Sequence, residues 1–240
     1  MMVLDIDRVG RVFGSGRVRV TALDDVSLRV RAGEFVALMG PSGSGKSTLL
    51  RIAGGLERPT TGRVLLAGRD VADFGEAGLA QTWRRQVGFV FQEANLLPSL
   101  TAAENVALAL ELDGVKRRPA MTGARGLLDS LGLAAVRDRF PAQLSGGEQQ
   151  RVAIARAVAG GRSLLLADEP TGALDALTGE AVMGLLRQRC DTGCAVVIAT
   201  HNIRHAAWAD RVMFLADGRL SGEAGPPAGP ECLLETGRTR

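Results

Sequence analysis

Short apolar runs alternate with polar and glycine-rich stretches along the chain, and their spacing predicts a mixture of strands and helices. From residue 26 to 31 apolar and polar positions alternate, which is typical of a half-buried strand. This strand closes a strand-rich segment from 2 to about 31, with a turn expected at 14–16. Further apolar runs predict short strands at 35–39, 63–66, 86–91, 164–167 and 195–200.

A helical pattern replaces the strands between residues 93 and 142. Apolar residues recur there at three- and four-residue spacing, mainly within 102–110 and 124–133, and Pro141 marks the end of the pattern. Further on, Asp217-Gly218 between two apolar runs predicts a hairpin. We therefore expect an α/β fold with an inserted helical segment.

Length and composition indicate how large the folded unit is and which kinds of partner it has. With 240 residues, 46% of them hydrophobic, one globular unit can hide about 70–75% of the surface of the unfolded chain. We place this unit at 2–222 and expect the glycine- and proline-rich residues 223–240 to form a flexible tail. The net charge of +3 comes without a long Lys/Arg run, so nucleic acid is not a favoured partner.

The cysteines and the longest apolar runs indicate where the chain works. Three cysteines are an odd and sparse set, which fits a reducing compartment. No signal peptide is expected, and no run approaches the roughly 20 apolar residues that cross a bilayer. If the protein works at a membrane, we expect another chain to span it.

A glycine-rich segment between a predicted strand and a predicted helix fits the phosphate-loop pattern G-x-x-x-x-G-K-[ST]. The segment consists of Gly40, Pro41, Ser42, Gly43, Ser44, Gly45, Lys46, Ser47 and Thr48. Its glycines let backbone N–H groups turn toward phosphate oxygens, Lys46 adds a positive charge, and Ser47 offers a hydroxyl to Mg²⁺. The expected ligand is therefore a nucleoside triphosphate with Mg²⁺, because a plain surface turn does not explain the flanking strand and helix.

Two carboxylates, Asp168 and Glu169, follow the apolar run at 164–167. Such a pair often begins an ordinary loop, but the carboxyl end of a buried strand is also where α/β sheets bind ligands. Beside a phosphate loop we expect Asp168 to hold the metal, directly or through water, and Glu169 to orient and deprotonate the attacking water. His201, at the end of the run at 195–200, is expected to face the phosphates.

Several polar positions allow a structural and a functional interpretation. Ser145 with Glu148 forms a capping box that starts a helix, and the glycines between them could expose N–H groups to a second anion. Asp175 can be a helix N-cap, and Phe13 can be a core residue or stack on adenine. Spacing alone makes Gln92 a strand end.

Two cysteines and two histidines imitate a zinc pattern: Cys190, Cys194, His201 and His205. Their separation is too short for a zinc finger, and an apolar strand fills the gap. Zinc is therefore not the expected metal.

With the phosphate loop, LSGGEQQR at 144–151, LLLADEP at 164–170 and His201 in this order, the chain resembles the ATP-binding subunits of ATP-binding cassette (ABC) transporters. The resemblance covers residues 2 to about 222. It implies a RecA-like core of the P-loop NTPases, an antiparallel β subdomain from the N-terminal strands, and a helical subdomain at about 93–150.

The resemblance also implies a nucleotide-dependent homodimer. Two copies would meet head to tail, each ATP lying between one phosphate loop and residues 145–147 of the other copy. ATP binding would close the dimer and hydrolysis would open it. This motion would drive a transmembrane permease docked around Gln92 and the following helical segment, at the cytoplasmic face of the cell membrane.

Individual roles follow from the same resemblance. Phe13 matches an aromatic residue, usually Tyr, that stacks on adenine. Phe keeps the ring and lacks the hydroxyl, so the resemblance does not determine how strictly the site selects adenine. Gln92 matches a glutamine near metal and water, Glu169 the catalytic base, Asp175 the acid of the D-loop, and His201 a histidine that senses the γ-phosphate. The signature motif corresponds to Leu144, Ser145, Gly146, Gly147, Glu148 and Gln149.

The stretches between the motifs resemble the macrolide-exporter and lipoprotein-release branch most, in which the permease has few membrane spans and often acts by mechanotransmission. One alternative is a soluble cassette ATPase of DNA repair or translation. Such proteins tend to carry long coiled-coil insertions or two cassettes, and neither is found in this sequence. A P-loop kinase is the other alternative, and it leaves LSGGEQQR unexplained.

Overall fold

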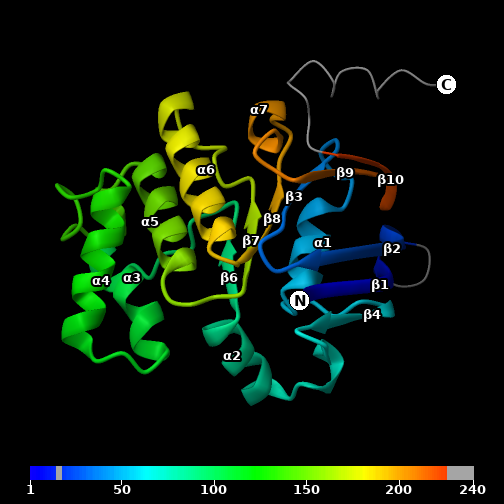
Figure 1. The fold of residues 1–240 in the computed structure, drawn as a ribbon, viewed down its shortest axis with the longest axis horizontal. Helices are drawn as coiled ribbons and strands as arrows, with labels where there is room; N and C mark the ends of the chain where they lie inside the picture. The colour runs from blue at the N-terminus through cyan, green and yellow to red at the C-terminus, as the bar shows by residue number, and fades with distance from the viewer. Residues whose placement is uncertain (15–17, 226–240) are drawn as a thin grey trace.

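The computed structural model describes residues 1–14 and 18–225, and all structural statements refer to these residues. Its centre is a six-stranded sheet in the order β10-β9-β3-β8-β7-β6 (Figure 1). Five of the strands are parallel, and only the edge strand β10 runs antiparallel to its neighbour. The strands are β3 (Phe35–Met39), β6 (Val87–Val90), β7 (Leu164–Asp168), β8 (Ala195–Ala199), β9 (Arg211–Ala216) and β10 (Arg219–Ala224).

The apolar character of the central strands follows from burial on both faces. In β3, Phe35 and Ala37 join a core with the helices on one face, whereas Val36 and Leu38 join a second core on the other face. Successive side chains of a strand point to opposite faces, so a strand covered on both sides needs apolar residues throughout. The predicted α/β class is confirmed.

A second, antiparallel sheet is built mostly from the N-terminal strands, in the order β2-β1-β4-β5. Its strands are β1 (Met2–Phe13), β2 (Val20–Arg31), β4 (Thr61–Leu66) and β5 (Arg69–Asp70). Helix α1 (Lys46–Ala53) lies between this sheet and the central one, and its Leu49, Leu50 and Ile52 belong to the core that both sheets share. The expected antiparallel β subdomain is confirmed, and it places one edge of the sheet near the start of α1.

Three helices pack against one another beyond strand β6, at the end of the central sheet away from the antiparallel sheet (Figure 1, left, green). They are α3 (Ala102–Leu112), α4 (Arg117–Ser130) and α5 (Gly146–Val158), with a short 3-10 helix η2 (Pro141–Gln143) before α5. The predicted helical segment at 93–150 contains α3 and α4, whereas α5 continues beyond it. The remaining helices are η1 (Val71–Asp73), α2 (Glu76–Arg85), α6 (Ala176–Asp191) and α7 (Ile203–Ala206).

Strand β10 and the described residues bear on two predicted boundaries, the domain end and the tail. Glu223 and Ala224 pair with Met213 and Val212 in the β9–β10 hairpin, so strand β10 runs two residues past the predicted domain end at 222. The rest of the predicted tail, 226–240, and most of the predicted turn at 14–16 lie outside the described residues. In the described part of the chain, no helix combines the length and the apolar character that a membrane crossing requires.

Candidate nucleotide-binding site

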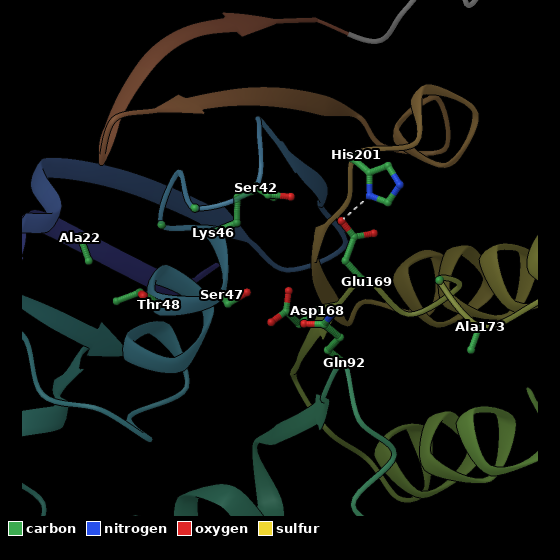
Figure 2. A pocket seen from close by; sticks show the side chains of 13 residues that line it. Ala22, Ser42, Lys46, Ser47, Thr48, Gln92, Asp168, Glu169, Ala173 and His201 are labelled. Atoms are coloured by element: carbon green, nitrogen blue, oxygen red, sulfur yellow. Dashed lines mark hydrogen bonds and ion pairs between the residues drawn. The ribbon is translucent and has the colours of Figure 1, made fainter. Parts of the chain in front are cut away.

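The loops after four parallel strands meet at one edge of the central sheet and enclose a pocket of about 610 Å³ (Figure 2). The phosphate loop follows β3, Gln92 follows β6, Asp168 ends β7, and His201 follows β8. The carboxyl ends of parallel strands share one edge, which is why residues far apart in sequence converge here. The pocket is lined by Ala22, Ser42, Gly43, Gly45, Lys46, Ser47, Thr48, Gln92, Asp168, Glu169, Gly172, Ala173 and His201.

The phosphate loop has the backbone that its glycines permit. Gly45 has φ +105°, and a Cβ there would lie 2.4 Å from the Ala22 carbonyl oxygen; at Gly43, with φ +80°, a Cβ would meet no atom within 4 Å. Gly45 is also the N-cap of α1 and supplies no side chain, so the first N–H groups of the helix remain available to an anion. The Lys46 Nζ donates hydrogen bonds to the carbonyls of Gly40 (2.8 Å) and Pro41 (2.9 Å), which fixes the ammonium inside the curve of the loop.

The side chains of Ser47 and Asp168 are neighbours in the pocket, with Gln92 beside Asp168 (Figure 2). Burial raises the pKa of the Asp168 carboxyl, a hydrogen bond from Ser47 opposes this shift, and the charge of Glu169 adds to it. A buried carboxylate, a hydroxyl and an amide oxygen are hard donors, and Mg²⁺ prefers such donors when it is shared with a phosphate. Their placement fits the predicted Mg²⁺ site.

Glu169 directly follows Asp168 and has the left-handed φ of +46°, which is uncommon for a residue with a Cβ. Its N–H donates to the Ala199 carbonyl (2.9 Å), and its carbonyl accepts from Gly172 N–H (3.1 Å). These bonds turn the carboxylate into the pocket, where Oε1 lies 2.8 Å from His201 Nδ1. Strained backbone of this kind clusters at functional sites. The structure thus brings the predicted base and the predicted histidine into direct contact.

The signature motif begins helix α5 and contributes no residue to the lining of this pocket. Ser145 caps the helix: its Oγ accepts from Glu148 N–H (3.2 Å), and its own N–H donates to Glu148 Oε2 (2.7 Å). The bond from the Ser145 backbone is the main cause that lowers the pKa of the Glu148 carboxyl. The predicted capping box is confirmed, while the anion site at this helix start remains a prediction.

The other ambiguous positions have clear structural surroundings. Asp175 is the N-cap of α6, accepting from Thr178 N–H (3.0 Å), and the hydroxyl of Thr178 is the main cause that lowers the Asp175 pKa. Phe13 is 38% exposed at the end of β1 and is not among the lining residues. The Arg11 guanidinium carbon lies 4.5 Å from the Phe13 ring centroid, and Arg11 Nη2 is 2.7 Å from Glu57 Oε1, so one ring face is already covered. Adenine stacking on Phe13 stays a prediction.

The residues of the imitated zinc pattern lie at two ends of a strand. Cys190 and Cys194 are buried before β8, and His201 lies after it. A five-residue strand separates them by about 16 Å at its usual rise, which is too far for one ion. No cluster of three metal-ligating Cys, His, Asp or Glu side chains is present within the described ranges.

Sequence reasoning missed several residues that shape the site. Gly172 and Ala173 line the pocket after Glu169, and Ala22 lines it from β2. The buried Thr171 and His205 are joined by a hydrogen bond of 2.8 Å between Oγ1 and Nδ1. No local pattern signals these contacts, because the partners are distant in sequence.

The chain is similar in sequence and in fold to known proteins. A model of the ABC transporter family matches residues 23–172. The macrolide export ATP-binding/permease protein MacB of Salmonella choleraesuis (strain SC-B67) is 48% identical over 226 residues, which are 94% of this chain and 35% of MacB. The chain therefore spans about a third of the length of MacB.

Two further relatives match over nearly their whole length. An uncharacterized ABC transporter ATP-binding protein of Thermotoga maritima is 46% identical over 220 residues, covering 92% of this chain and 94% of that protein. The ATP-binding cassette MJ0796, solved as a dimer in a post-hydrolysis state with ADP and Pi, has a TM-score of 0.89 at 40% identity and covers 94% of this chain and 100% of its own. The predicted likeness to the macrolide-exporter branch is confirmed, and the chain belongs to the ABC transporter family as one of its ATP-binding cassettes.

Proposed function

We propose that the chain binds ATP with Mg²⁺ in this pocket, hydrolyses it, and drives a membrane permease. The observation that carries the proposal is the 2.8 Å contact between Glu169 and His201 beside the phosphate loop. A carboxylate held by a neighbouring histidine at the open end of a phosphate site can orient a water for attack on the γ-phosphate and accept its proton.

The remaining pocket residues divide the work of binding. The N–H groups of the phosphate loop and Lys46 bind the β- and γ-phosphates, which compete with the carbonyls of Gly40 and Pro41 for the ammonium. Ser47, Asp168 and Gln92 would hold Mg²⁺. The ion would neutralise charge on the phosphate oxygens while they react.

A second copy of the chain would complete each site. Ser145, Gly146 and Gly147 lie at the start of α5, outside the pocket of their own chain, and this helix start is free to face the ATP of another copy. The similar cassette MJ0796 forms a dimer. ATP would stabilise the closed dimer because its γ-phosphate would gain contacts from both copies, and hydrolysis would remove them.

The permease would dock beside Gln92 on the helical subdomain. A groove of about 240 Å³ lies between α2, β6, α3 and α5. Its lining includes apolar residues such as Trp83, Phe89 and Leu108, and also the three arginines Arg84, Arg156 and Arg162. Leu112 at the edge of this groove is 51% exposed. Such an apolar groove suits a short amphipathic helix of a cytoplasmic permease loop. The chain would then sit at the cytoplasmic face of the membrane, held by its partner and not by nucleic acid.

Capture from native membranes tests this function. Tagged Glu169→Gln protein with ATP and Mg²⁺ should stay in the closed dimer and recover a protein with several membrane spans. The wild-type chain, purified together with this membrane protein, should hydrolyse ATP. A Lys46→Ala bait, which should bind ATP poorly, is the matched control. Recovery of only membrane-free proteins or nucleic acid with both baits would contradict the permease proposal.

A further inference from the structure

His205 is a buried polar residue that the proposed chemistry does not use. It lies on the four-residue helix α7, is 8% exposed, and its Nδ1 is 2.8 Å from the hydroxyl of Thr171, itself 7% exposed. On its other side the ring packs against α6, where Nε2 lies 3.4 Å from the position that a Cβ on Gly179 would take. An isolated helix of one turn is not stable, so α7 depends on such tertiary contacts.

The hydrogen bond joins the two segments that carry the proposed catalytic pair. Thr171 lies two residues after Glu169, in a turn closed by Gly172 N–H bonding to the Glu169 carbonyl (3.1 Å). His205 lies four residues after His201, on the helix that Asn202 caps. The Glu169–His201 bond joins the same segments on the open side, where the His201 side chain is 76% exposed. The buried bond therefore joins the two segments on the inner side of the Glu169–His201 bond.

We propose that His205 is a positioning residue, whose bond to Thr171 holds the segment after β7 against α7 so that Glu169 and His201 meet at the γ-phosphate. The inference rests on the proposed ATP hydrolysis and adds a residue to it. Loss of the buried bond would leave the outer pair and the bonds of Glu169 to Ala199 and Thr200 to hold the start of the two segments, while Thr171 and α7 would lose the bond that joins them directly. The rate of hydrolysis should then fall more than the affinity for ATP, because the phosphate loop is built separately.

The charges around His205 favour its neutral form. Burial lowers the pKa of the imidazole and His201 contributes to this, whereas Glu180 on α6 and Glu169 oppose it. Protonation at acid pH would place a charge in a buried site. Protonation of His205 should therefore add to the acid limb in the pH dependence of kcat that the base Glu169 also produces, and this added part should be missing when residue 205 cannot titrate.

The test compares kcat and KM for ATP in the full chain carrying His205→Leu, Thr171→Val, or both. A buried hydrogen bond of usual strength predicts a loss of about five- to tenfold in kcat for each single variant, with KM within about twofold. The double variant should be no slower than the slower single one, since both lose the same bond. His205→Asn, which keeps a polar atom near the Nδ1 position, should retain kcat within about threefold of wild type and lack the part of the acid limb that His205 adds.

Several results would overturn the inference. These are additive losses in the double variant, an equal loss in His205→Asn and His205→Leu, or a kcat within twofold of wild type in His205→Leu at full ATP-binding stoichiometry. If His205→Leu does not fold, His205→Gln replaces it. The glutamine amide lies near the Nε2 position and not near Nδ1, so this variant should hydrolyse ATP more slowly than His205→Asn. Wild type without ATP turnover would refute the proposed function and this inference with it. Normal turnover that Glu169→Gln abolishes, with unaffected His205 variants, would refute this inference alone.

Discussion

Replacing Asn105 with leucine should remove about 2–4 kcal/mol from the free energy of unfolding. Asn105 is fully buried on α3 and ties the loop after Gln92 to this helix. Its Oδ1 accepts from Leu97 N–H (2.8 Å), and its Nδ2 donates to the carbonyls of Leu97 (3.1 Å), Leu100 (2.9 Å) and Thr101 (3.0 Å). One side chain thus satisfies four backbone groups.

The magnitude follows from which groups lose every partner. The Leu97 carbonyl would keep its bond from Leu100 N–H, and the Thr101 carbonyl would keep the bond from the backbone of residue 105. Leu97 N–H and the Leu100 carbonyl have no other partner within the described chain. Each orphaned group costs about 1–3 kcal/mol, and the exposed position of the loop lets water reduce the total.

Urea unfolding followed by tryptophan fluorescence measures this loss. Gln188→Leu is the matched control, because it replaces an exposed amide on α6 and should stay within about 0.5 kcal/mol of wild type. An Asn105→Leu variant that unfolds within the same 0.5 kcal/mol would refute the assigned role of Asn105.

Three further outcomes can be checked. Gly45→Ala should lower the free energy of unfolding by about 1–3 kcal/mol and weaken ATP binding, because its Cβ would lie 2.4 Å from a carbonyl oxygen. Thermal unfolding and nucleotide titration measure the two effects, and Gly161→Ala, with open space around it, should be near neutral in both. Burial raises the pKa of Cys190 to about 11 and of Cys194 to about 12, so at pH 8 about one Cys190 in a thousand is a thiolate, and peptide mass spectrometry should find both alkylated by iodoacetamide only after unfolding. Because burial lowers the pKa of His205 in the folded protein, its contribution to stability is fully present above the pKa of 6.5 in the unfolded chain and is lost as the pH falls toward the pKa in the folded protein. His205→Asn should therefore flatten the decline of Tm between about pH 7 and 5. An equally steep decline in this variant would exclude His205 as its cause.

Much of the fold could be predicted because local patterns and tertiary burial agree. The strand at 35–39 is apolar since both of its faces are covered, and Ser145 with Glu148 marks a helix start in any context. Helix α2 was missed because its polar sequence carries only a short apolar stripe around Leu79 and Trp83.

The residues of the site could be predicted where they belong to a sequence motif, and not where they depend on a contact between residues far apart in the sequence. The phosphate loop, Asp168, Glu169 and His201 each follow an apolar strand, so the topology brings them to one edge. The bond between Thr171 and His205 joins residues 34 positions apart, and neither has a local signal. Asn105 could have been noticed, because an amide on the apolar face of a predicted helix needs partners.

Release of phosphate from ATP by the purified chain tests the central claim most directly. With Mg²⁺, wild type should turn over ATP, Glu169→Gln should bind ATP and lose about 10³-fold or more in rate, and Glu111→Gln on α3, outside the pocket, should match wild type. Turnover by Glu169→Gln at the wild-type rate would contradict the account of this site.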